Sequence, residues 1–137
     1  NMANDPSQAN AQAAAPTSLA TCPASPNCVC SVDNGRSHYI EPLAVDGDPD
    51  AAWEALRKTL NVDPSIQLIT DTDHYLQAEA KTRILRFTDD LEFLLDRAAG
   101  VIHMRSASRV GYSDLGKNRR RLEGIRQVLQ DRIGDST

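Results

Sequence analysis

Apolar positions recur with the period of a helix in two stretches of the chain. In the first stretch, Asp48-Pro49 precedes an apolar stripe that ends near Leu60. An acceptor side chain followed by proline is typical of a helix start. The second stretch runs from 113–114 to about Ile133, and its apolar stripe consists of Leu115, Leu122, Ile125, Leu129 and Ile133. Both stripes predict amphipathic helices that pack one side against a core.

Between these helices, short runs of alternating apolar and polar residues predict β-strands. The five runs are Ile66–Thr70, His74–Ala80, Arg83–Phe87, Leu91–Leu95 and Val101–Ser106. Short polar separators join them, as in an antiparallel meander. Asp89-Asp90 is either a turn or a bulge inside one long strand. The order predicts an α+β domain: an antiparallel β-meander of about five strands, with an N-terminal and a long C-terminal helix packed on one face.

The first 21 residues lack the composition of a folded segment. From Ala3 to Thr21 they are rich in Ala, Gln, Asn, Pro and Ser, and Asp5 is their only charge. We therefore expect residues 1–21 to be a disordered tether and residues 22–137 to be a single α+β domain. Such tethers commonly follow an export signal or lipid anchor. We expect an exported protein, periplasmic or membrane-anchored through a removed N-terminal signal, with a cytoplasmic location as the alternative.

The charge of the chain is acidic overall but unevenly distributed. The net charge of −4 argues against a nucleic-acid partner. From Arg105 to Arg132, however, eight basic residues stand against three acidic ones. Either the C-terminal helix complements an acidic sheet within the molecule, or it presents a basic face to an external anion.

The three cysteines, Cys22, Cys28 and Cys30, lie within nine positions of one another. In an oxidising compartment, Cys22 can close a small loop with Cys28 or with Cys30. Cys28 and Cys30 are the least favourable pair, because alternate residues of an extended chain point to opposite faces. A zinc site needs a fourth ligand, for which His38 is the nearest candidate, but the spacing fits no familiar zinc motif. We expect no metal and no cofactor.

Polar residues with binding chemistry gather before the last helix and on one predicted strand. The candidate ligand-binding residues are Arg105, Ser106, Ser108, Arg109, Tyr112, Asn118, Asp89, Asp90 and Glu92. Arginines are fork-shaped donors that suit phosphate or carboxylate, and a helix start adds free N–H groups. Asn118 falls near the middle of an apolar stripe, so a buried amide there needs hydrogen-bond partners. The same residues can instead form a closed ion-pair network.

These observations favour a non-catalytic domain that binds a small anionic or apolar ligand, or an envelope protein. One alternative is an anion- or phosphate-binding domain that uses the Arg–Ser loop, residues 105–111. Another is a carboxylate-based hydrolase that uses Asp90 and Glu92, which share one face of a strand. The sequence contains no recognised nucleophile constellation, P-loop or dinucleotide fingerprint, which favours a non-catalytic role over an enzyme and leaves the enzyme as the open alternative.

Four ordered motifs resemble those of a known family. They are Cys22–Val29, Phe87–Phe93, Arg105–Gly111 and Asp114–Arg119. Together they resemble the domain-of-unknown-function 1499 family over roughly Cys22 to Ile133. The resemblance implies these domain boundaries, supports export and implies no activity. It also implies that Cys22 pairs with Cys28, because Cys30 stands where the family pattern has serine.

Overall fold

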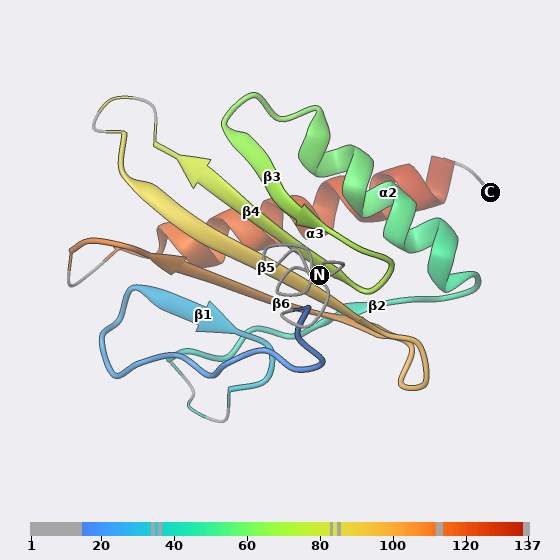
Figure 1. The fold of residues 1–137 in the computed structure, drawn as a ribbon, viewed down its shortest axis with the longest axis horizontal. Helices are drawn as coiled ribbons and strands as arrows, with labels where there is room; N and C mark the ends of the chain where they lie inside the picture. Colours follow the sequence, from blue (N-terminus) through green and yellow to red (C-terminus); the bar gives the residue numbers. More distant parts are fainter. Residues whose placement is uncertain are drawn as a thin grey trace, which may run out of the picture.

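The computed structural model describes residues 15–33, 35, 37–82, 84, 86–111 and 114–135. In this part of the chain, a six-stranded sheet carries two helices (Figure 1), which is an α+β fold. The elements are β1 (Cys28–Cys30), β2 (Leu43–Ala44), α2 (Pro49–Asn61), β3 (Ile66–Asp71), β4 (Tyr75–Lys81), β5 (Thr88–Asp96), β6 (Val101–Ser108) and α3 (Lys117–Asp135). The strand order is β1-β6-β5-β4-β3, β2 also pairs with β6, and all these pairs are antiparallel.

The sheet differs from the predicted meander in three places. The sequence does not predict β1 and β2 as strands, because two or three residues are too few to show an alternation of apolar and polar positions. Both strands lie beside β6. Asp89-Asp90 forms neither a turn nor a bulge, since β5 pairs through both residues in regular register. The predicted strand Arg83–Phe87 is wrong for its described residues. Arg86 has a φ of 57°, in the left-handed region, and Thr82 and Phe87 close a turn with two hydrogen bonds.

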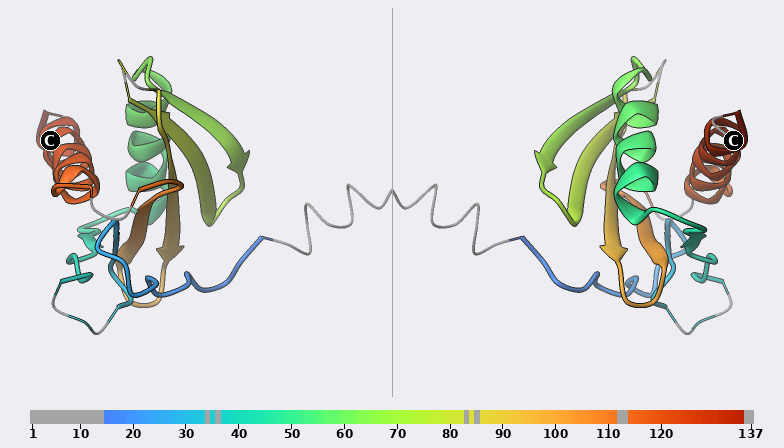
Figure 2. Two further views of the ribbon diagram at one scale, coloured as in Figure 1. Left: turned by 90° about the vertical axis from the view of Figure 1, so that its left-hand side faces the viewer. Right: turned by 90° about the vertical axis from the view of Figure 1, so that its right-hand side faces the viewer.

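Both helices cover the same face of the sheet, as predicted (Figure 2). Alternation along β5 places Leu91, Phe93 and Leu95 on this face, and all three are buried. Leu56 and Leu60 of α2 complete one core with them. Three residues of α3 also belong to it: Leu122, Ile125 and Leu129.

Each helix begins where a carboxylate accepts backbone N–H groups. Asp48 accepts from the N–H of Asp50 at 3.0 Å, and α2 starts at the following proline, as predicted. The start of α3 was placed too early. Leu115 and Gly116 have positive φ values of 52° and 82°, which exclude a helix there, and Asp114 accepts from the N–H of Gly116 and of Asn118. Leu115, predicted in the apolar stripe, is consequently exposed.

Two arginines hold α3 against the irregular segment 37–42. Arg119 donates to the carbonyl oxygens of Tyr39 (2.7 Å) and Ser37 (3.2 Å). Arg126 donates to the carbonyl oxygens of Glu41 (2.6 Å) and Pro42 (3.1 Å). Guanidinium groups bonded to backbone carbonyls fix the helix without requiring acidic partners.

The chain that precedes β1 crosses to the face of the sheet opposite the helices (Figure 2). Leu19 is buried there with Cys30, Tyr75 and Leu94. Leu19 belongs to the predicted tether, of which residues 15–21 are described and residues 1–14 lie outside the described part.

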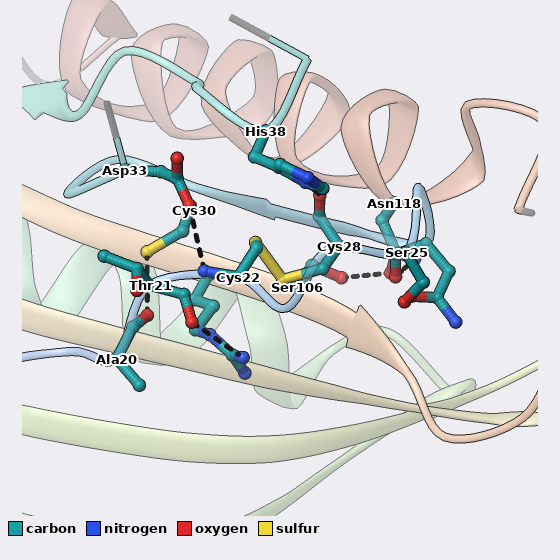
Figure 3. The surroundings of a disulfide bond; sticks show 12 residues. Ala20, Thr21, Cys22, Ser25, Cys28, Cys30, Asp33, His38, Ser106 and Asn118 are labelled. Atoms are coloured by element: carbon teal, nitrogen blue, oxygen red, sulfur yellow. Dashed lines mark hydrogen bonds between the residues drawn. A yellow bond between two sulfur atoms is a disulfide. The ribbon is translucent and has the colours of Figure 1, made fainter. Parts of the chain in front are cut away.

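A disulfide between Cys22 and Cys28 closes the turn before β1 (Figure 3). The N–H of Cys22 also donates to Asp33 at 2.9 Å. Cys30 is a free, buried thiol 3.3 Å from the carbonyl oxygen of Ala20. Burial raises the pKa of this thiol.

Candidate functional site

The sheet divides the candidate ligand-binding residues between its two faces. Successive side chains of a strand point in opposite directions. Asp89, Ser106 and Ser108 therefore face α3, while Asp90, Glu92 and Arg105 face the other way. Arg109 joins the second group, Asn118 joins the first, and Tyr112 lies outside the described residues. Residues 105–108 belong to β6, so the predicted Arg–Ser loop is a strand over half its length.

On the helix side, Asn118 is completely buried and all its polar atoms have partners. Its side-chain N–H groups lie 2.7 Å from Asp114, 2.9 Å from Ser108 and 3.0 Å from the carbonyl oxygen of Asn27. Its side-chain oxygen accepts from the hydroxyl of Ser106. One amide thus joins the start of α3, the end of β6 and the residue before β1, which is the polar closure expected of an amide in an apolar stripe.

Asp89 lies beside this amide, with a side chain that is 0% exposed. Its carboxylate is 2.6 Å from Nη1 of Arg121 and 3.1 Å from Nζ of Lys117. Arg121 also contacts the side-chain oxygen of Asn118 at 3.3 Å. A buried carboxylate with two cations is compensated within the molecule, and the group as a whole carries one positive charge.

On the opposite face, Arg109 is already bound by carboxylates. It makes two parallel hydrogen bonds to Asp90, both 2.9 Å long, and a third of 2.6 Å to Glu79. The hydrogen bonds to Asp90 and then to Glu79 raise the pKa of Arg109 above its ordinary value. An external anion at Arg109 would have to displace these two side chains.

The second cluster on that face contains Glu92, Tyr75 and Arg105. The hydroxyl of Tyr75 donates to Glu92 at 2.6 Å, and Nη1 of Arg105 lies 3.7 Å from the same carboxylate. Burial, and then the hydrogen bond to Glu92, raise the pKa of Tyr75. Asp90 and Glu92 share a face as predicted, but each carboxylate has its own partners.

A groove that the sequence did not indicate lies between the end of α2, the start of β3 and α3. It has two adjoining parts, of about 940 and 660 Å³, which share Asp63, Pro64, Ile66 and Arg121. We call it the α2–α3 groove. Its first part is polar and extends round the ends of β3 and β4. It is also lined by Lys81, Arg86, Gln67 and Glu79, and the last two lie on the face of the sheet opposite the helices. Its second part is mainly apolar and is also lined by Val62, Gly124, Ile125 and Val128.

The polar part of the groove contains positive charge that no internal carboxylate neutralises. Within the described residues, Lys81 and Arg86 make no ion pair, and both side chains are exposed. Of the two carboxylates in this part, Glu79 is bound to Arg109, and Asp63 accepts from the N–H and hydroxyl of Ser65. Lys81 and Arg86 border a short connection with no motif, so only the tertiary structure brings them beside Arg121.

The described residues contain neither a membrane-spanning helix nor a cluster of metal ligands. None of their helices is long and apolar enough to cross a membrane. In the same residues, no three His, Cys, Asp or Glu side chains come together as metal ligands.

Comparison with known proteins agrees with the motifs. No curated protein sequence matches the chain. The model of the family described as "Protein of unknown function (DUF1499)" matches residues 18–129, from the segment that contains Leu19 to the last turns of α3. This match covers most of the chain and all six strands of the sheet. The chain therefore belongs to the DUF1499 family.

Proposed function

We propose that this protein is a non-catalytic binding domain that takes a carboxylate- or phosphate-bearing ligand in the α2–α3 groove. The observation that carries the proposal is the pair of unneutralised cations, Lys81 and Arg86, beside Arg121 in one recess. Cations that converge on a concave surface attract anions and orient them.

The other polar clusters support this choice, because their charged groups already have partners within the molecule. Arg109 is saturated by Asp90 and Glu79, and Asp89 is saturated by Lys117 and Arg121. A hydrolase that uses Asp90 and Glu92 needs carboxylates free to exchange protons with a substrate. These two are engaged by Arg109 and by Tyr75, respectively.

We further propose that the domain is exported or faces the periplasm. The Cys22–Cys28 disulfide supports this, since such bonds persist in oxidising compartments and are rare in the cytosol. Detection of the native protein in a periplasmic rather than a cytosolic fraction tests the location.

Isothermal titration calorimetry and thermal shift with inorganic phosphate, acetate and a sugar acid, at constant ionic strength, test the binding proposal. We expect saturable binding to the wild type and at least a tenfold weaker affinity in the double variant Lys81→Ala/Arg86→Ala. Both side chains are exposed, so this variant should keep its fold.

The matched control is Lys58→Ala/Arg97→Ala, which also removes one exposed lysine and one exposed arginine, both outside the groove. It should bind like the wild type. If Arg109→Ala loses binding and the groove variant keeps it, the ligand sits on the Arg–Ser segment instead. If no anion binds the wild type, the anion site is refuted and a protein partner becomes the better hypothesis.

A further inference from the structure

We infer that the ligand of the α2–α3 groove is an anionic amphiphile, with a phosphate or carboxylate head and an alkyl chain. This inference rests on the proposed function and extends it to the second half of the groove. The cationic recess alone would suit any small anion. The adjoining apolar part shares four lining residues with this recess, and an alkyl chain on the ligand would occupy it.

The apolar part offers surface that solvent now covers. Val62 is 62% exposed and Val128 is 43% exposed, and they border the groove on α2's end and on α3. Ile66 and Ile125 line the same part of the groove. Covering exposed apolar surface with an alkyl chain is favourable in proportion to the area removed from water.

Gly124 leaves the backbone of α3 uncovered in the apolar part of the groove. It stands inside the helix, where glycine is less favourable than alanine. Its backbone does not require glycine, because it is not among the positive-φ positions. Its neighbours do not require it either, since an added Cβ would meet no atom within 4 Å. The space over Gly124 opens into the apolar part of the groove, where a chain could lie against the helix backbone.

The arrangement of groups along the groove suits such a ligand. Lys81 and Arg86 line only the polar part. Val62 and Val128 line only the apolar part, together with Arg120, which donates to the carbonyl oxygen of Leu115. Arg121 lies at the junction, with Nη1 held by Asp89. A headgroup at the two free cations would therefore extend its chain past Arg121 and over Gly124.

A chain-length series of alkyl phosphates, from methyl to dodecyl and each below its critical micelle concentration, tests the inference by calorimetry. We expect the affinity of the wild type to rise about threefold for each added methylene until the apolar part is filled. Gly124→Phe fills that part with a side chain. It should keep the affinity for methyl phosphate and lose the gain with chain length, while Gln130→Phe, at an exposed position of α3 outside the groove, should bind like the wild type.

Val128→Asn provides a second test that does not depend on Gly124, since this exposed position tolerates a polar side chain. It should lower the gain per methylene without changing methyl phosphate binding. Equal affinities for methyl and octyl phosphate in the wild type would overturn the amphiphile and leave the anion site standing. Failure of every phosphate to bind would instead refute the proposed function itself.

Vesicles of phosphatidylcholine with and without phosphatidic acid separate a free amphiphile from a lipid in a bilayer. A groove that encloses one chain binds soluble octyl phosphate, and octyl phosphate should compete with any binding to phosphatidic acid vesicles. Binding to vesicles that octyl phosphate does not inhibit, and that Gly124→Phe does not weaken, would overturn the inference in favour of a membrane-surface contact.

Discussion

At the scale of single residues, Asn118 is the polar centre of the fold. Replacement by leucine keeps the volume but leaves the buried hydroxyl of Ser106 without its acceptor and removes one of the two hydrogen bonds that the carbonyl oxygen of Asn27 accepts. We predict that Asn118→Leu lowers the free energy of unfolding by about 2–3 kcal/mol, because unsatisfied buried polar groups are costly. Urea denaturation measures the change, with Gln127→Leu on the exposed side of α3 as the control. A loss below about 1 kcal/mol would show that water or rearrangement replaces the amide.

Asp114 makes the stability depend on pH in the acid range. Burial raises its pKa, but the hydrogen bonds it accepts from the Asn118 side chain and from the N–H of Gly116 and Asn118 outweigh burial, so its pKa lies below the ordinary value. The contribution to stability is therefore present above about pH 4, the pKa of an unfolded aspartate, and is lost as the pH falls through the folded pKa.

The test compares the wild type with Asp114→Asn at pH 6 and pH 3 by urea denaturation. We expect the variant to be less stable at pH 6 and the difference to shrink at pH 3, because the wild-type carboxyl is then increasingly protonated. Parallel pH profiles for the two proteins would contradict this account.

The sequence predicts some of these residues better than others. Asn118 stands out on a helical wheel, and its burial with polar partners follows from that position. The separation of Asp89 from Asp90 follows from strand alternation, once both are known to lie within one strand. Lys81 and Arg86 show no such signal, since their role depends on how α3 packs across the end of the sheet. A groove forms where elements distant in sequence pack together, so the local pattern of apolar and polar residues does not predict it.

At the scale of elements, α3 carries a glycine that its own stability does not need. We predict that Gly124→Ala raises the free energy of unfolding by about 0.5–1 kcal/mol, since alanine favours the helix and has open space here. Gly116→Ala is the matched control and should destabilise, because Gly116 has a φ of 82° and an added Cβ would lie 3.0 Å from Arg120. Thermal unfolding of both variants measures the contrast. A destabilising Gly124→Ala would mean that the helix is constrained there in some other way.

The sequence predicts an element well where its apolar pattern extends over many residues and a capping residue marks its start. It predicts short strands and irregular helix starts poorly. Asp48-Pro49 marked the start of α2, because the capping carboxylate and the proline are adjacent in sequence. The start of α3 was misplaced, because Leu115 continues the apolar stripe although its backbone is left-handed. β1 and β2 are defined by their partner β6, which local pattern cannot identify.

At the scale of the whole molecule, the disulfide holds the segment that packs across the sheet. We predict that reduction lowers the free energy of unfolding by about 2 kcal/mol, as expected for a short cross-linked loop. The midpoint of thermal unfolding should then fall by about 5–10 °C. Scans with and without reductant measure it, and Cys22→Ala/Cys28→Ala, which should not respond to reductant, is the control. An unchanged midpoint in wild-type protein whose thiols are shown to be free would contradict the prediction.

The pairing of β1 with β6 decides when this fold can be completed. Cys28 lies opposite Ala107, and Asn118 bonds to the residue before β1 across 91 positions of sequence. The hairpins from β3 to β6 can pair as they emerge from a ribosome, but the first strand waits for the last one. Oxidation need not wait, because its cysteines are six positions apart. A cross-linked turn can therefore exist early in the chain, before the strand beside which it will lie has been made.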